Sequence, residues 1–455
     1  MSTSPLSPEA AQPRGALSER SVAEVPTRLR PARAPGRAWA VVAMVAVLMA
    51  VDFADKQVLG LAADPIRHEF GLDAAAYGMV SGSFYLLFSV SALAVGFVSN
   101  RVRTTRLLTV MAVAWALTAL PVLVASSVPM LYLSRILLGA AEGPAMPVAV
   151  HAVHKWFPEH NRAVPTALVQ FGGALGVAVA GPVLGHLIAQ HGWRSAFATL
   201  ALVSVVWVVV WPLVGREGPL TTYAAASGNV SAADSGPATP EPRLPYRRLL
   251  LNGSWLGTLA AGLGAYWTLA VGVAWLPTYL EKSLGRTTAE TGRLVAAPAL
   301  VAAVAIVVVP WLSATLMRRG ASGRLARGLV VACTAAASGV CLLILPIAHG
   351  SAAVALMALG FGLPNAVFPL FYLISAQITP VAQRGAVLAL GTAIATLAGV
   401  AAPGVTGRLI DQAASTPHGL HTGLVVAAVL TLAGGALCAF AVDPERDARR
   451  LGLLP

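Results

Sequence analysis

Charged residues are scarce in this 455-residue chain, and their scarcity excludes most soluble folds. Asp, Glu, Lys and Arg together make up 11% of the residues, whereas 57% are hydrophobic. A soluble protein of this length needs more charge to cover its surface. Apolar runs of about 20 residues, the length that crosses a bilayer, recur from end to end. The composition therefore predicts an integral membrane protein with the lipid bilayer as its solvent.

Cysteine and lysine are also rare. The three cysteines lie inside apolar runs, a pattern that argues against a disulfide framework or a metal site. The net charge of +12 comes mostly from arginines in short segments between apolar runs, which argues against a nucleic-acid partner. The sequence also lacks a Gly-rich phosphate loop followed by Lys and a Ser/His/Asp order. We therefore expect no enzyme, no cofactor and no bound metal.

The apolar runs predict an all-α, polytopic fold with twelve transmembrane helices. The expected spans are 38–62, 76–99, 105–126, 129–153, 163–190, 195–214, 252–280, 291–316, 326–348, 351–376, 385–410 and 419–441. The composition of residues 1–37 predicts a disordered tail, and 442–455 form a second tail. A Pro-rich stretch in 215–250 predicts a flexible linker between two six-span halves, 38–214 and 251–441.

Basic residues lie mainly on one side of these spans. With the N-terminus inside, the inner segments carry 23 Lys and Arg and the outer loops carry 6. Because positive residues are retained on the cytoplasmic side, this asymmetry predicts that both termini are cytoplasmic. The frequent use of Arg, Ala and Gly points to a GC-rich bacterial genome, and hence to a bacterial inner membrane.

The two halves resemble each other in sequence. Residues 161–188 align with residues 383–410 without a gap, and Arg162 then falls on Arg384. The two segments are the fifth and the eleventh span, six spans apart. A parallel duplication of a six-span unit is typical of transporters that alternate access between two halves. The fold is therefore expected to consist of two pseudo-symmetric six-helix bundles.

Five ionisable residues other than His lie well inside the expected spans. They are Asp52, Asp55, Lys56, Arg135 and Glu142, in the first and fourth spans. Each would cost about 2.5–3.5 kcal/mol or more if it faced lipid. Helical spacing places the residues of each span on one side of the helix and at similar depth. We therefore expect the two helices to turn these groups toward each other in one polar cavity.

The charges of this group do not balance, since two positive residues face three negative ones. An entering organic monoanion would add a further negative charge, which two protons on the carboxylates would neutralise. Carboxyl groups in such surroundings, Asp52 among them, can exchange protons near neutral pH. The count permits proton-coupled entry of an anion bound by Lys56 or Arg135, and equally the exchange of a cation against protons. Static salt bridges, Asp52–Lys56 and Arg135–Glu142, are the structural alternative.

Several segments resemble the major facilitator superfamily, and within it the anion:cation symporter branch. The stretch DFADKQVLGLAADPI carries the acid–base pair Asp55-Lys56 after an aromatic residue, with Lys where the branch usually has Arg. The stretch SRILLGAAEGPAMP places Arg135, Gly139 and Glu142 at the branch's arginine-to-glutamate segment. Further matches are HKWFPEHNRA, HGWRSAF and WLPTYL.

This resemblance, which covers residues 38–441, implies a transporter whose two bundles rock about a central site. It implies that Asp55 and Glu142 carry protons, and that Lys56 and Arg135 engage a substrate carboxylate or organise those acids. The expected function is proton-coupled uptake of a small organic anion, such as a sugar acid or an aromatic carboxylate. The partners are then this carboxylate substrate, protons and the lipid bilayer, and the protein is expected to be a monomer.

The gating loop between the second and third spans departs from the superfamily pattern. Gly96 and Arg101 are retained, but Asn100 stands where the pattern has an acid. The corresponding loop of the second half has Ala314 at that place. The cytoplasmic gate contacts of the superfamily are therefore altered in both halves.

Other polar side chains at mid-depth are candidates to orient a ligand, namely Tyr85, Gln170, Tyr266 and Asn365. Contact between helices is the alternative role for each. Two rival functions also stay open. One is a proton-driven antiporter that exports a cationic or amphipathic metabolite, and the other is a transporter-like sensor that binds its ligand without moving it.

Overall fold

The computed structural model describes residues 36–98, 102–124, 127–157, 161–219, 243–380 and 383–454. Within these residues the chain is all-helical, and twelve stretches are long and apolar enough to cross a membrane. They begin and end within a few residues of the predicted spans. The prediction of an all-α protein with twelve transmembrane helices is therefore confirmed.

In chain order, the helices are α1 (Gly36–Leu61), α2 (Ala63–Phe70), α3 (Ala74–Val98), α4 (Thr104–Leu123), α5 (Val128–Glu142), α6 (Ala145–His154), α7 (Ala163–His191), α8 (Trp193–Val214), α11 (Tyr246–Leu250), α12 (Gly253–Lys282), α13 (Thr288–Leu294), α14 (Ala296–Arg318), η2 (Arg324–Leu329), α15 (Val330–Ile344), η3 (Leu345–Ile347), α16 (Gly350–Gly362), η4 (Leu363–Ala366), α17 (Val367–Gln377), α18 (Arg384–Asp411), α19 (Thr416–Ala441) and α20 (Pro444–Arg450). Pairs or triplets of these form the fourth (α5, α6), eighth (α13, α14), ninth (η2, α15, η3) and tenth (α16, η4, α17) spans.

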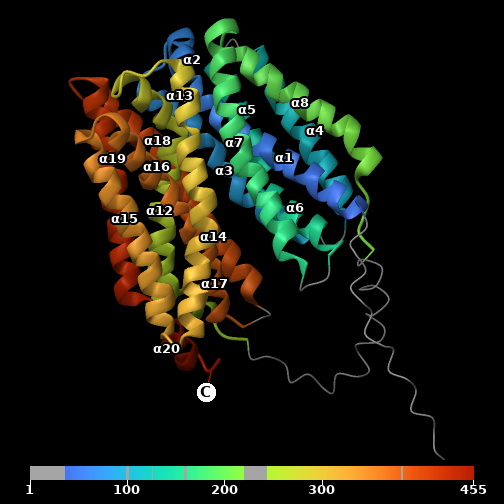
Figure 1. Ribbon diagram of the computed structural model, residues 1–455, viewed down its shortest axis with the longest axis vertical. Helices are drawn as coiled ribbons and strands as arrows, with labels where there is room; N and C mark the ends of the chain where they lie inside the picture. Colours follow the sequence, from blue (N-terminus) through green and yellow to red (C-terminus); the bar gives the residue numbers. More distant parts are fainter. Residues whose placement is uncertain are drawn as a thin grey trace, which may run out of the picture.

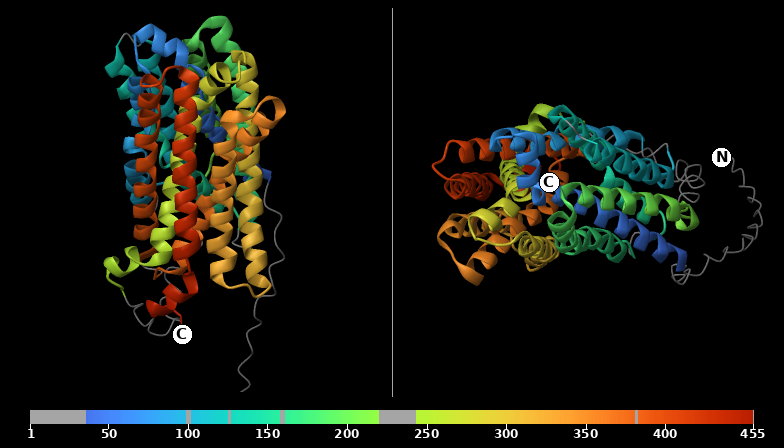
Figure 2. Two further views of the ribbon diagram at one scale, coloured as in Figure 1. Left: turned by 90° about the vertical axis from the view of Figure 1, so that its left-hand side faces the viewer. Right: turned by 90° about the horizontal axis from the view of Figure 1, so that it is seen from above.

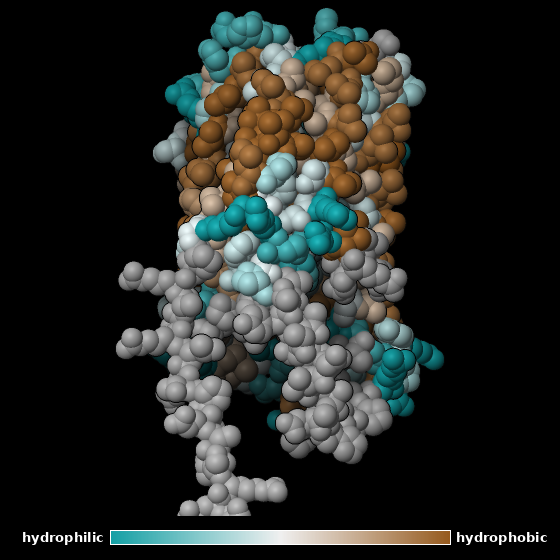
Figure 3. Space-filling view, turned by 90° about the vertical axis from the view of Figure 1, so that its right-hand side faces the viewer, coloured by the Kyte–Doolittle hydropathy of each residue, from teal (hydrophilic) through white to brown (hydrophobic). Residues whose placement is uncertain are grey.

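The two halves form two groups of helices that stand side by side (Figures 1 and 2). In the first half α1 packs on α7, α3 on α5 and α4 on α8, and in the second half α12 and α15 pack on α19. We call the end of the molecule that carries α2 and α13 the α2 end, and the end where α8 ends and α11 begins the linker end. Figure 3 shows a broad hydrophobic area on the first half between hydrophilic residues near both ends.

The internal repeat has the same local structure in both halves. Arg162 donates a hydrogen bond from Nε to the carbonyl of Phe157 at 3.1 Å. Arg384, its partner in the alignment, donates from Nε to the carbonyl of Thr379 at the same distance. Each arginine thus ties the start of a long helix, α7 or α18, to the residue five positions before it.

The two halves make their closest approach near the α2 end, where α3 packs on α18 and α7 packs on α13. A Cβ atom at Gly78 of α3 would collide with the carbonyl oxygen of Pro403 of α18. Likewise, a Cβ atom at Gly181 of α7 would collide with the carbonyl oxygen of Gly292 of α13, and one at Gly292 with that of Gly181. Small residues let helix backbones meet in this way in membrane proteins. The α2 end is therefore closed by backbone-to-backbone contact between the halves.

Two polar links add to this closure. The Asp411 carboxylate at the end of α18 accepts hydrogen bonds from the backbone N–H groups of Ala74 and Ala75, at 2.9 and 2.7 Å. These N–H groups begin α3, so a residue of the second half caps a helix of the first. Lys282 of α12 also pairs with Asp64 of α2 at 2.6 Å.

Proline interrupts two of the spans where the sequence places it. The helix α5 ends at Glu142, because Gly143 and Pro144 follow and proline has no N–H to continue the helical ladder. In the tenth span, Pro364 lies in the short 3-10 helix η4 between α16 and α17. Neighbouring helices tolerate such breaks in a membrane. The break in the fourth span places Glu142 at a helix end inside the bundle.

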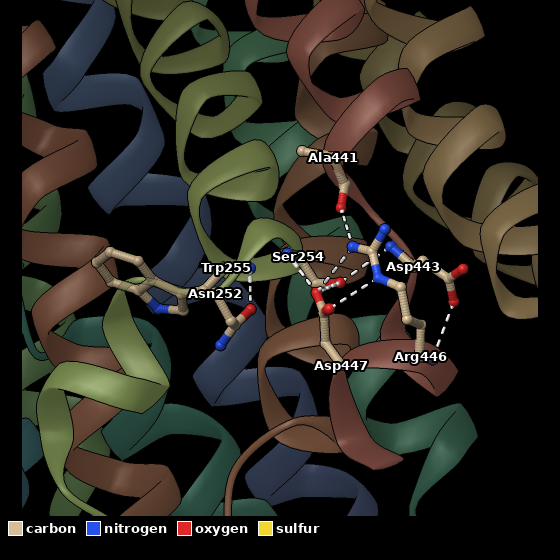
Figure 4. Close-up of polar contacts among 7 residues, drawn as sticks. All are labelled: Asn252, Ser254, Trp255, Ala441, Asp443, Arg446 and Asp447. Carbon is tan, nitrogen blue, oxygen red and sulfur yellow. Dashed lines mark hydrogen bonds and ion pairs between the residues drawn. The ribbon is translucent and has the colours of Figure 1, made fainter. Parts of the chain in front are cut away.

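Within the predicted C-terminal tail, residues 444–450 form a docked helix, α20, at the linker end of the second half (Figure 4). The carboxylate of Asp447 is buried and accepts hydrogen bonds from the N–H and hydroxyl of Ser254, at 2.9 and 2.7 Å. Arg446 donates to the same carboxylate at 2.9 Å, and Asn252 caps α12 by accepting from the N–H of Trp255. The helix α20 therefore anchors the start of α12.

The predicted linker, 215–250, falls largely outside the described residues, but both of its edges are ordered. On the first edge, Glu217 accepts a hydrogen bond from the N–H of Thr105 at 2.9 Å and pairs with Lys155 at 2.7 Å. On the second edge, residues 246–250 form the short helix α11. The first edge of the linker is thus packed against the first half, and its second edge begins the second half.

Candidate functional site

Three of the five predicted intramembrane charges meet between α1 and α5. The Nζ atom of Lys56 lies 2.5 Å from Oδ2 of Asp52 and 3.0 Å from Oε2 of Glu142. The side chains of Asp52 and Glu142 are 3% and 0% exposed, and that of Lys56 is 18% exposed. We call Asp52, Lys56 and Glu142 the charge triad. Its geometry brings the polar sides of the first and fourth spans together.

Glycines next to Glu142 explain how α5 comes close enough to complete the triad. A Cβ atom at Gly139 would collide with the carbonyl oxygen of Phe84 in α3, and one at Gly143 with that of Phe88. The fourth span therefore lies directly against α3 on both sides of Glu142. The ring of Phe84 also lies 5.9 Å from the Lys56 ammonium. Close packing of α5 on α3 thus holds the Glu142 carboxylate at the level of Lys56.

The other two charges, Asp55 and Arg135, are buried beside the triad. Neither forms an ion pair within 4.0 Å among the described residues, although Arg135 exerts the strongest electrostatic attraction on Asp55. The Arg135 guanidinium lies 5.5 Å from the ring centre of Phe197 on α8. The Arg135–Glu142 bridge considered above does not form in the described residues, because Glu142 pairs with Lys56 instead.

The carboxylates of the triad are not saturated with hydrogen bonds. Oδ1 of Asp52 and both carboxylate oxygens of Glu142 accept none from the described residues. Two buried carboxyl groups thus share one ammonium, which leaves the triad with a formal charge of −1. A buried charge without a counter-charge is costly, so a proton on either carboxyl group would stabilise the triad.

A cavity of about 730 Å³ lies between the two halves, lined by α1, α6 and α7 on one side and by α12, α14, α16 and η4 on the other. Arg162 lines it at the linker end. Phe53 and Gln57 line it where it passes the triad, and the Phe53 ring centre lies 4.8 Å from the Lys56 ammonium. The triad therefore lies directly behind the cavity wall, whereas the sequence predicted that its charges would line the cavity.

The four other predicted contact residues divide into two groups. Gln170 and Asn365 line the cavity. Tyr85 instead packs against a glycine of α18, and Tyr266 packs on a phenylalanine of α17 with ring centres 4.7 Å apart. Among the described residues, the two amides thus face the cavity and the two phenols lie between helices.

The predicted gating loop lies mostly beyond the described residues. Gly96 belongs to α3, whereas Asn100 and Arg101 fall outside the described ranges. In the part of the chain that the structure describes, no group of three or more His, Cys, Asp or Glu is arranged to hold a metal ion.

Several cavity residues were not selected from the sequence. Phe53 and Gln57 are four residues apart on either side of Lys56, so helical spacing places them on one face of α1. His154 and Arg162 line the cavity at the linker end, where His154 shares a hydrogen bond with Thr166 at 2.8 Å. The sequence signal for Arg162 is its match to Arg384 in the repeat, which indicates a duplication but not a place in the cavity.

Twelve membrane-spanning stretches among the described residues, two similar halves and a cavity between them define a polytopic membrane transporter. The sequence model of the Major Facilitator Superfamily matches residues 45–363, and the chain belongs to this superfamily.

Its relatives include carriers of acids. The chain is 27% identical over 296 residues to a probable sulfoacetate transporter of Cupriavidus necator, a match that covers 64% of this chain and 68% of that one. It is 25% identical over 365 residues to the hexuronate transporter of Bacillus subtilis, with 80% and 85% covered. Among solved structures, a bacterial homologue of the lysosomal transporter Spinster, inward-facing and unoccupied, matches with a TM-score of 0.70 at 17% identity, covering 91% of this chain and 98% of that one. That structure supports the fold alone.

Proposed function

We propose that the protein takes up a small organic anion together with protons, by alternating access of its two halves. The observation that carries this proposal is the charge triad, in which two buried carboxyl groups share the single ammonium of Lys56 beside the central cavity. A site with one acid in excess is suited to bind and release a proton. The relatives that transport acids support the choice of an anion.

The roles proposed for the five charges follow from their contacts. Asp52 and Glu142 share the triad's proton, and Asp55, opposed by Arg135, is the third carboxyl group able to take one. Lys56 and Arg135 supply the positive charge that a substrate carboxylate requires. Because Lys56 is held by two acids, protonation of the triad weakens its ion pairs and frees the ammonium to attract the anion.

The proposed setting is a bacterial inner membrane with the linker end in the cytoplasm, as the distribution of basic residues predicts. The protein acts as a monomer in this proposal. With this orientation the cavity reaches toward the cytoplasm while the α2 end is closed. Opening of the α2 end and closure of the linker end would then present the same cavity to the opposite side.

A proton-flux assay in proteoliposomes tests the proposal. Addition of a transported carboxylate outside should make the external medium more alkaline, because each anion enters with protons. Glu142→Gln should abolish this alkalinisation, since an amide cannot take part in proton exchange. Glu290→Gln is the matched control, because Glu290 completes a capping box with Thr287 at the start of α13 and Gln serves equally there. A Glu142→Gln variant that still couples normally would refute the role of Glu142.

The net negative charge of the triad also favours a second candidate, a proton-driven exporter of a cationic or amphipathic metabolite. The two candidates differ in what they require of Lys56. Lys56→Gln should abolish anion uptake, whereas it should improve transport of a cation because it removes a repulsive charge. A transporter-like sensor, in contrast, would show saturable binding and no pH-dependent flux with either substrate.

A further inference from the structure

The wall of the central cavity is chemically uniform over most of its area. Of the 26 described residues that line it, six have polar side chains, namely Gln57, His154, Arg162, Thr166, Gln170 and Asn365. The others are aliphatic, aromatic or glycine, and on α12, α14 and α16 every lining residue is one of these. An occupant of this cavity therefore meets hydrocarbon along the wall opposite α1 and α7, except where Asn365 of η4 reaches it.

Most of the polar lining groups already have partners in the protein. His154 is bonded to Thr166, and Nε of Arg162 donates to a backbone carbonyl. The side-chain amide of Asn365 donates to two backbone carbonyls of the tenth span, at 3.3 and 3.1 Å. Gln57 and Gln170 are the two lining amides that make no hydrogen bond with any described residue. Both belong to the first half, on α1 and α7.

This distribution discriminates between the two kinds of organic acid considered above. A sugar acid carries a hydroxyl on nearly every carbon, and each hydroxyl that leaves water without finding a partner weakens binding about tenfold. Apart from the guanidinium of Arg162 at the linker end, these two amides are the lining groups left to bind such a ligand, and they are too few to satisfy its hydroxyls along its length. A hydrophobic body, in contrast, gains affinity with every part of its surface that the apolar wall removes from water.

We infer that the anion taken up by this protein is a carboxylate with a hydrophobic, ring-sized body rather than a polyhydroxylated sugar acid. This inference rests on the proposed function and narrows it. The carboxylate binds near Phe53 and Gln57, within electrostatic reach of the Lys56 ammonium behind them. The body lies along Val273 and Ala302 on the opposite wall. A cavity of about 730 Å³ is large enough for a bicyclic aromatic acid.

Calorimetric titration of the purified full-length protein in detergent tests the inference without interference from passive membrane permeation. The two probes are 2-naphthoate and D-galactonate, which carry the same single charge on an aromatic and a polyol body. We expect 2-naphthoate to bind at least about tenfold more tightly. Equal or tighter binding of D-galactonate would overturn the inference and leave organic-anion transport standing. Binding of tetraphenylphosphonium but of neither acid would overturn both.

Paired variants of α14 locate the site. Ala302→Phe fills the cavity wall and should weaken 2-naphthoate binding at least about tenfold, whereas Val304→Phe lies on the outer, 61% exposed face and should leave it within about twofold. Val273→Thr keeps the shape of the wall but adds a hydroxyl, so it tests the apolar character of the wall without added bulk. It should weaken the binding of 2-naphthoate but not that of D-galactonate. Unchanged 2-naphthoate affinity in both cavity variants would overturn the assignment.

Discussion

At the scale of single residues, Lys56 balances two buried acids, and its removal should be far more costly than the loss of an exposed lysine. Lys56→Gln leaves Asp52 and Glu142 facing each other with no counter-charge, a change that typically costs about 3–5 kcal/mol. Adding Asp52→Asn should recover much of this loss, because one remaining carboxyl group can stay protonated. Thermal unfolding of the single and double variants in detergent, arranged as a double-mutant cycle, measures the coupling.

Lys282→Gln is the control for this prediction. Lys282 also forms a close ion pair, with Asp64 at 2.6 Å, but its side chain is 48% exposed and such pairs contribute about 0–1 kcal/mol. A Lys56→Gln variant that is destabilised no more than Lys282→Gln would contradict the burial argument. Strictly additive effects of Lys56→Gln and Asp52→Asn would show that the two residues do not share one charge site.

The sequence reveals the residues of the charge triad but not their pairing. A charged residue in an apolar helix stands out because lipid does not tolerate it, so Asp52, Lys56 and Glu142 could be identified from hydropathy alone. Which residue pairs with Glu142 depends on the rotation and axial offset of α5 against α1. These are set by the contacts of Gly139 and Gly143 with α3, which no local pattern reports. For the same reason, the sequence did not predict that Phe53 separates the triad from the cavity.

At the scale of helices, spans are far easier to predict than the short elements that anchor them. The hydropathy of each apolar run is a local property, so the positions of the twelve spans could be predicted to within a few residues. The helix α20 is short and strongly charged, so hydropathy does not reveal it, and Asp447 docks it on the start of α12. That docking depends on Asp447 meeting Ser254 across 193 positions of sequence.

The docking of α20 should depend on pH in a definite direction. Burial by itself raises the pKa of Asp447, but hydrogen bonds from Arg446 and Ser254 outweigh it and hold this pKa below its ordinary value of 3.8. A lowered pKa in the folded state means that the stabilisation is present above pH 3.8 and is lost as the pH falls through the folded-state pKa. Thermal unfolding followed from pH 7 to pH 3 should therefore show a falling Tm at the acid end.

Asp447→Asn should reduce this acid dependence and lower stability at pH 7 by about 1–3 kcal/mol, because the donors of Ser254 and Arg446 lose a charged acceptor. Arg449→Gln, on the exposed side of the same helix, is the control and should leave the Tm unchanged. If Asp447→Asn matched wild type at pH 7, the bonds shown in Figure 4 would not contribute to anchoring α12.

The cap that Asp411 places on α3 joins the two halves only while the α2 end is closed. Asp411→Asn leaves one acceptor oxygen for two N–H groups, so it should weaken the cap by about 1 kcal/mol and favour the form open at the α2 end about fivefold. Spin labels on cysteines introduced at His68 and Ala414, exposed positions of opposite halves, should report a larger population of long distances. Asp73→Asn, which alters a cap within α3's own half, should leave the distance distribution unchanged. An unchanged distribution in Asp411→Asn would show that the cap does not hold the halves together.

At the scale of the whole molecule, closure of the α2 end and access to the cavity from the linker end are two aspects of one conformation. A single cysteine at Ala303, on the cavity wall, reports on both when Cys333, Cys341 and Cys438 are replaced by Ala. A membrane-impermeant thiol reagent should label it in inside-out vesicles and much more slowly in right-side-out vesicles, because only the linker end admits the reagent.

Adding Gly78→Leu should reverse this preference, since a side chain there collides with the backbone of Pro403 and forces the α2 end apart. Labelling from the same side in both backgrounds would mean that contact between α3 and α18 does not control access. Faster labelling of the parent in right-side-out vesicles would instead reverse the proposed orientation of the chain.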